Sequence, residues 1–101
     1  MITVYHNPKF SDLSFNKDIG NAVKAHLDLL EQVAEVEVDD LNKAYRLTNN
    51  IESSWTKNLH VTPVEDESVL THGFRSTSVG DCMEKDGQLF VVAPCGFEEV
   101  Q

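Results

Sequence analysis

The chain has 101 residues, of which 41% are hydrophobic and 25% are charged, and these fractions are typical of a folded domain rather than of a disordered chain. This length accommodates one core, so we expect a single domain spanning residues 1–101. The formal net charge of −9 indicates a surface that repels nucleic-acid phosphates and favours basic protein partners. Because the sequence has neither an apolar run near the ~20 residues of a membrane-spanning helix nor the basic start of a secretion signal, we expect a cytoplasmic protein that avoids membranes.

The first third of the chain predicts one strand and one helix. Residues 2–6 are β-branched and aromatic, which is typical of a strand, and Asn7 and Pro8 end it because proline cannot donate to a sheet. Apolar residues then recur at spacings of three and four, which predicts a helix over residues 16–32.

The next segment predicts a strand followed by a second helix. Residues 33–38 alternate between apolar and acidic side chains, so we expect a half-buried strand with an acidic outer face. A helix is predicted from residue 41 to about residue 49. Either Asp39 or Asp40 can cap it, since a carboxylate there accepts hydrogen bonds from free N–H groups and meets the positive end of the helix dipole.

The rest of the chain is predicted to be mostly β-structure. Residues 59–62 predict a short strand, and residues 82–85 and 88–92 flank an Asp-Gly pair, which is a strong signal for a two-residue hairpin turn. Residues 97–100 predict a final strand. Strands and helices do not strictly alternate, so the expected class is α+β: a compact, mostly antiparallel sheet with two helices and a C-terminal β-hairpin.

The sequence contains no recognised catalytic or metal-binding motif. Its four histidines lack metal-ligand spacing, and no phosphate loop, dinucleotide fingerprint or nucleophile elbow is present. The predicted hairpin pairs Cys82 with Val91 and carries Cys95 four residues further along, beyond the ~7 Å Cα separation of a disulfide unless the chain folds back at Pro94. We therefore expect reduced thiols, no cofactor, no metal and no catalytic residue.

Two other features each leave two interpretations open. Residues 75–81 place Arg75 beside several hydroxyl groups, which could receive a phosphate or carboxylate, although Arg75 could instead pair with Asp81 and hold a turn. The single tryptophan, Trp55, could anchor a partner on the surface or, as is more common in a domain of this size, belong to the core.

Part of the chain resembles a known family. Residues 74–81 (FRSTSVGD) precede a strand, an Asp-Gly turn, a second strand and residues 96–100 (GFEEV). This order resembles the C-terminal signature of the YodL-like domain family: a histidine or arginine before S-x-S-V-x-D, a short hairpin, and G-F-x-x followed by an aliphatic residue. Residues 47–55 are also similar to small proteins of tailed phages. The resemblance implies an accessory protein of a phage or mobile element, and it implies no established reaction.

These observations lead to the hypothesis of a non-enzymatic accessory protein that binds and modulates a host protein through an acidic surface, in the cytoplasm of the host cell. A nucleic-acid-handling enzyme is a plausible target because its basic groove attracts negative charge. The candidate partner-binding residues are Glu35, Glu37, Asp39, Asp40, Trp55, Glu65, Asp66, Glu67 and Arg75. The alternative is a small nucleic-acid-binding module that uses the turn region from Arg75 to Asp81, although the basic residues do not cluster in the sequence.

Overall fold

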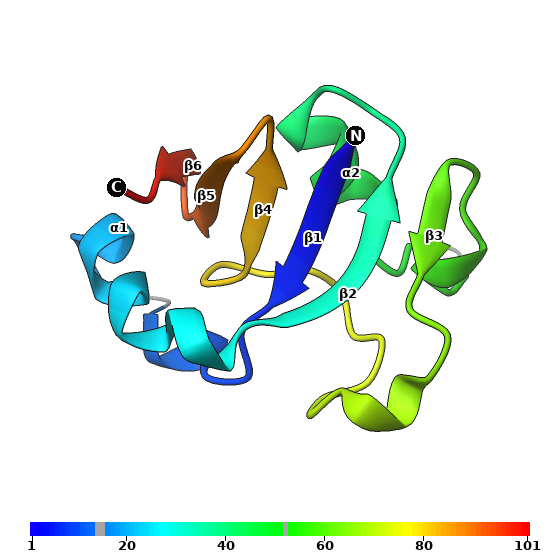
Figure 1. Ribbon diagram of the computed structural model, residues 1–101, viewed down its shortest axis with the longest axis horizontal. Helices are drawn as coiled ribbons and strands as arrows, with labels where there is room; N and C mark the ends of the chain where they lie inside the picture. Colours follow the sequence, from blue (N-terminus) through cyan, green and yellow to red (C-terminus); the bar gives the residue numbers. More distant parts are fainter. Residues whose placement is uncertain (14–15, 52) are drawn as a thin grey trace.

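A computed structural model describes residues 1–13, 16–51 and 53–101, and it confirms the α+β class (Figure 1). In these residues, six strands form one antiparallel sheet in the order β3-β2-β1-β4-β5-β6. The strands are β1 (Ile2–His6), β2 (Glu31–Val36), β3 (Val61–Pro63), β4 (Cys82–Lys85), β5 (Gln88–Ala93) and β6 (Gly96–Glu99). The helices are α1 (Ile19–Ala22) and α2 (Leu41–Leu47), with 3₁₀ turns η1 (Phe10–Leu13), η2 (Val23–Leu29), η3 (Trp55–Lys57) and η4 (Glu67–Val69).

Strand β1 occupies the middle of the sheet, as its β-branched sequence suits, and it pairs with β2 on one side and β4 on the other. Its alternation buries Ile2 and Val4 on one face and leaves Thr3 and Tyr5 half-buried on the opposite face. Strand β2 bulges against β1, so that Val33 and Ala34 lie opposite Val4 and both are buried.

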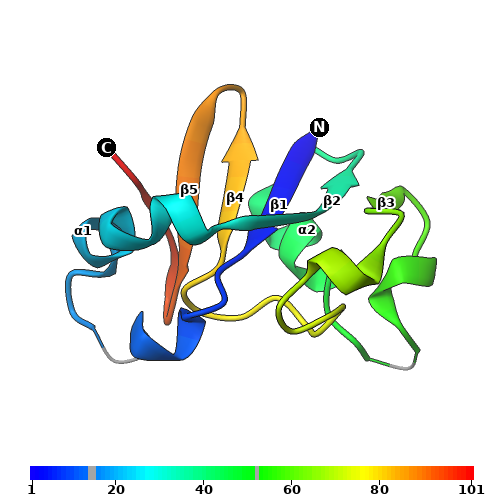
Figure 2. The same cartoon turned by 60° about the horizontal axis from the view of Figure 1, so that its bottom comes forward.

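The two faces of the sheet carry separate cores. The first lies on the face that α2 covers, and its buried members are Ile2, Val4, Val33, Ala34, Val36, Ala44, Trp55, Leu70, Met83 and Val92. The second lies on the opposite face near β4 and β5, and its buried members are Leu13, Ile19, Val23, Cys82 and Val91. In Figure 1, α2 lies behind β1 and β2 and α1 lies beside the β6 end, and Figure 2 shows η2 leading from α1 into β2.

The predicted long helix over residues 16–32 is wrong in extent. The segment forms only α1, a four-residue α-helix, and then the tighter η2, and Leu30 is already extended as the chain enters β2. Gly20 weakens the α-helix, and the side chain of Asp18 at its start accepts no capping hydrogen bond from the backbone. Only Ile19 and Val23 of this segment are buried, and Ala22 and Leu30 are partly buried against the second core, so packing does not sustain a longer helix.

The second predicted strand is present but begins and ends two residues earlier than residues 33–38. The chain leaves the sheet after Val36, because the Val38 N–H donates back to the Val36 carbonyl in a tight turn. The second helix starts where predicted, with the Asp40 carboxylate accepting the Asn42 N–H at 2.8 Å, and it ends at Leu47, two residues before the predicted end.

The C-terminal hairpin has the predicted register, with Lys85 opposite Gln88 and Cys82 opposite Val91. The strand predicted over residues 59–62 forms as β3, which begins two residues later and ends one residue later than predicted. The last predicted strand forms as β6. Among the described residues, no helix is both long and apolar enough to cross a bilayer.

The hairpin turn generates a test of the fold. Asp86 and Gly87 have φ values of 52° and 81°, and a β-branched side chain rarely adopts such a conformation. We expect Gly87→Val to lower the free energy of unfolding by about 1–3 kcal/mol, measured by urea denaturation. The strain is conformational, since a Cβ at Gly87 would have no other heavy atom within 4 Å.

Gln88→Val is the matched control, because it places the same side chain on the adjoining strand, where valine is favoured. Equal stability of the two variants would contradict the assigned turn.

Candidate functional site

A buried carboxylate organises the polar interior. Asp81 is fully buried immediately before β4 and accepts two hydrogen bonds of 2.7 Å from the Arg75 guanidinium. The backbone N–H groups of Asn7 and Ser78 also donate to it, each at 2.7 Å. Four charge-assisted or backbone donors thus compensate the loss of hydration of this charge. They fasten the segment before β4 to the residue that follows β1.

Arg75 has its guanidinium engaged within the protein. Besides binding Asp81, it donates to the carbonyl oxygens of Ser76 at 2.9 Å and Asn7 at 3.2 Å. Its Cζ atom lies 3.8 Å from the ring centroid of Phe10, a cation–π geometry. Of the two interpretations of Arg75, pairing with Asp81 is therefore the one that the structure shows, and this weighs against a nucleic-acid site in the turn region.

His6 lies beside this ion pair in a chain of hydroxyl groups. Thr48 donates to the Ala44 carbonyl, and Thr77 donates to Thr48 at 2.8 Å, so Thr77 accepts from His6 Nε2 at 2.9 Å. His6 Nδ1 has no hydrogen-bond partner in the described part of the chain. Burial lowers the pKa of His6 from 6.5 to about 4, and the neighbouring Asp81 only partly opposes this effect.

The geometry of this group differs from that of a catalytic triad. In a triad, the carboxylate and the hydroxyl contact different nitrogens of the imidazole ring. Here Asp81 Oδ2, at 4.0 Å, and Thr77 Oγ1 both face the same nitrogen, Nε2 of His6. All three side chains are buried, with 4% or less of their residues exposed. The arrangement holds the fold together and leaves no room for a substrate at the hydroxyl.

Trp55 is a core residue. It is fully buried in η3, and its indole N–H donates to the carbonyl oxygens of Phe74 at 3.1 Å and Arg75 at 2.8 Å. Its ring meets those of His6 and Phe74 edge to face. The interpretation of Trp55 as an exposed anchor is therefore wrong, because the satisfied indole and the packed ring leave nothing to present to a partner.

The half of the sheet opposite α2 carries exposed acidic side chains. Glu35 on β2 lies opposite Thr3 on β1, which in turn lies opposite Glu84 on β4, so these three residues form one row across the strands. Residues that face each other in antiparallel strands share a face, and Tyr5 lies on that face two residues further along β1. We call Thr3, Tyr5, Glu35 and Glu84 the outer face. Thr62 on β3 extends the row.

The electrostatics of the outer face are dominated by unneutralised carboxylates. Glu35 and Glu84 are exposed, as is Glu37 beyond the end of β2, and within the described residues none of them forms an ion pair. Burial raises the pKa of the Tyr5 phenol above 10.0, and the charges of Glu84 and Glu35 raise it further. The two carboxylates therefore act on the same hydroxyl group.

The other predicted acidic residues lie outside this row. Asp39 is 93% exposed and sits 3.5 Å from the N-terminal ammonium group, while Asp40 caps α2. Glu65, Asp66 and Glu67 are exposed around η4, where Asp66 caps the turn and Glu67 accepts the Phe74 N–H at 3.1 Å. Hydrogen bonds from Ser68 lower the pKa of Asp66.

Sequence reasoning missed Thr3, Tyr5 and Glu84. Their alternation with buried neighbours in β1 and β4 is a signal that they share a solvent side, but it does not say which strands pair. The row depends on contacts between residues about eighty positions apart, such as Thr3 and Glu84.

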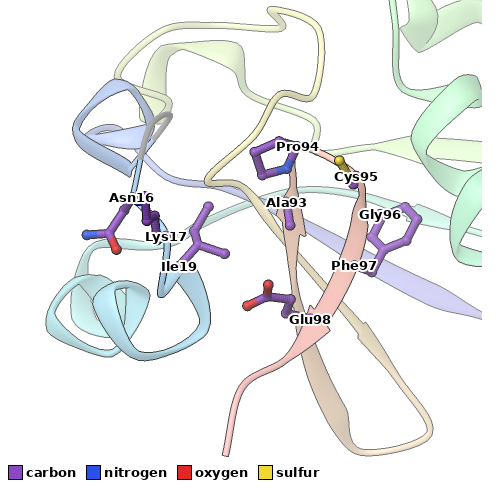
Figure 3. A pocket seen from close by; sticks show the side chains of 9 residues that line it. All are labelled: Asn16, Lys17, Ile19, Ala93, Pro94, Cys95, Gly96, Phe97 and Glu98. Atoms are coloured by element: carbon purple, nitrogen blue, oxygen red, sulfur yellow. The ribbon is translucent and has the colours of Figure 1, made fainter.

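A shallow hollow of about 280 Å³ lies at the other end of the sheet. Figure 3 shows Asn16, Lys17 and Ile19 on one side and the β5–β6 turn, with Pro94 and Cys95, on the other. Cys95 is exposed at this turn, whereas Cys82 is buried in the second core, and burial raises the pKa of the Cys82 thiol to about 12. Cys82 therefore remains a neutral thiol near pH 7.

Within residues 1–13, 16–51 and 53–101, no group of three or more His, Cys, Asp or Glu side chains is placed to hold a metal ion. No family model, curated protein or solved structure matches this chain. The fold and the two sheet faces define its class: an α+β domain with a buried network of polar side chains around Asp81 and an exposed, acidic sheet face.

The lowered pKa of His6 predicts a pH-dependent stability. A group whose pKa is lower in the folded state than its ordinary value of 6.5 favours folding when neutral. Its contribution is therefore complete above pH 6.5 and declines as the pH falls towards 4. At about 1.4 kcal/mol per pKa unit, the complete loss amounts to about 3–4 kcal/mol.

Urea denaturation between pH 7.5 and 5.0 measures this slope. The His6→Gln variant, which has no ionisable group at this position, should show a shallower decline. A wild-type stability that stays constant over this range would contradict the assignment of His6 as a neutral buried group.

The contacts of Asp81 predict a large loss of stability when its carboxylate is removed. We expect Asp81→Ala to lower the free energy of unfolding by about 3 kcal/mol or more, because it leaves the Arg75 guanidinium and two backbone N–H groups without their acceptor. The exposed Asp12→Ala should stay within about 0.5 kcal/mol of wild type. Similar losses in both variants by thermal or urea unfolding would show that the buried pair does not hold the fold.

Proposed function

We propose that the chain is a non-enzymatic accessory protein that binds a protein partner with a basic surface. The single observation that carries this proposal is the outer face, where exposed carboxylates have no ion-pair partner in the described residues. Charges that are not neutralised internally remain free to complement an opposite charge on another protein, and such complementarity steers association.

The distribution of positive charge supports a protein partner over a nucleic acid. The chain carries 17 acidic and 8 basic side chains, and the guanidinium of Arg75 is occupied by Asp81. A nucleic-acid-binding surface needs a basic patch to replace the counterions of the phosphates. The alternative function in the turn region lacks the free cation that it requires.

The resemblance of residues 74–81 and 96–100 to the YodL-like signature supports an origin in a phage or mobile element. The partner is then a host protein in the host cytoplasm. A nuclease or polymerase fits the charge argument, because such enzymes present a basic groove to nucleic acid, and occupation of that groove would modulate them.

Capture of the partner from a bacterial lysate, followed by measurement of Kd against salt concentration, tests the proposal. We expect Kd to rise with salt, because charges are screened over roughly 10 Å at 0.1 M. The double variant Glu35→Lys/Glu37→Lys should bind more weakly with an unchanged melting temperature, since both side chains are exposed.

Asp12→Lys/Asp28→Lys is the matched control, because it changes the net charge equally at exposed positions of η1 and η2. An affinity that is insensitive to salt and unchanged in the Glu35→Lys/Glu37→Lys variant would contradict the proposal. Binding of DNA or RNA by the wild-type protein would instead support the nucleic-acid alternative.

A further inference from the structure

Tyr5 is the aromatic residue of the outer face, and it follows Thr3, the residue that lies between the two glutamates. Neighbouring strands are about 4.8 Å apart, so Glu35 and Glu84 stand on the two sides of β1, each one strand away from Thr3. Tyr5 is two residues further along β1, at about 6.6 Å, and is a diagonal neighbour of both glutamates. Diagonal neighbours are within reach when one of them is aromatic and the other is long.

The position of Tyr5 gives it a fixed ring and an accessible edge. Its side chain packs against the second core, yet it remains only half-buried at the boundary between the covered and the open parts of the face. A ring held in this way loses little conformational entropy when a partner contacts it. The charges of Glu84 and Glu35 both raise the pKa of its phenol, as expected of carboxylates that lie near the hydroxyl group.

We propose that the outer face docks an arginine side chain of the partner protein, which packs on Tyr5 between the carboxylates of Glu35 and Glu84. This inference rests on the proposed function and specifies the chemistry of its partner. A planar, weakly hydrated guanidinium both packs on an aromatic ring and donates paired hydrogen bonds to carboxylates. A lysine ammonium group is a more strongly hydrated point charge and makes no paired contact.

Charge complementarity determines this choice of occupant. The sheet row offers two negative groups separated by a threonine, and its cross-strand neighbours Thr62 and Leu89 carry no charge. A guanidinium at the centre would be the first positive group in the row. Tyrosine and arginine are also among the residue types that are enriched at the positions that dominate binding energy at interfaces.

Titration of the ¹⁵N-labelled full chain with the capped tripeptide acetyl-Gly-Arg-Gly-amide tests the inference by NMR. We expect saturable shifts of the Thr3, Tyr5, Glu35 and Glu84 amide signals, with a Kd in the millimolar range, about 1–10 mM. The isosteric citrulline peptide, which is neutral, should leave these signals unmoved. The lysine peptide should bind several-fold more weakly.

Variants separate the docking position from a general attraction of charge. Glu35→Gln/Glu84→Gln keeps the shape of both exposed side chains and should raise Kd about 10-fold, whereas Asp12→Asn/Asp28→Asn should change it less than about 2-fold. Tyr5→Phe should retain binding because it keeps the ring, and Tyr5→Leu should weaken it. The amide spectrum of each variant reports whether it is folded.

The outcomes distinguish this inference from the proposed function. Three results would overturn the proposed arginine site while leaving a general acidic interface intact. The first is peptide-induced shifts spread over all acidic segments. The others are an equal loss of peptide affinity in Asp12→Asn/Asp28→Asn and an equal affinity for the lysine peptide. Capture of the partner that is insensitive to salt and unchanged in the Glu35→Lys/Glu37→Lys variant would overturn both proposals.

Discussion

The fold depends on the buried carboxylate of Asp81. Its two oxygens accept from Arg75 and from two backbone N–H groups, at a point where the end of β1, the loop before β4 and β4 itself meet. A carboxylate without these donors would be too costly to bury, and the loop without the carboxylate would have no acceptor for its N–H groups. The pair thus fixes how β4 enters the sheet beside β1.

That constraint determines which side of the sheet is free. With β4 beside β1, Thr3 lies between Glu35 and Glu84, and the same register sends Ile2 and Val4 into the core beneath α2. The turns η1 and η2 and helix α1 cover the β4–β5 end of the opposite face. The open part of that face exposes its carboxylates because no helix or strand among the described residues packs over it.

Buried and exposed charges have opposite roles in this molecule. Asp81 and Arg75 satisfy each other and the backbone, so their charges stabilise the loop and are not available for recognition. Glu35 and Glu84 remain in solvent without ion-pair partners among the described residues, and they add little to stability. This division directs the functional proposal to the outer face and away from the polar motif around Arg75.

The sequence alone determined the elements whose signals are local: β1, the capped start of α2, and the hairpin with its Asp-Gly turn and register. It also indicated that Glu35 and Glu37 face solvent, because strand alternation is a property of adjacent residues. Tertiary structure decided the length of the first helix, the burial of Trp55 and the pairing of Arg75 with Asp81. It also decided the juxtaposition of Tyr5 with Glu84, because such pairings join residues far apart in the chain, and no local pattern specifies which of several similar strands become neighbours.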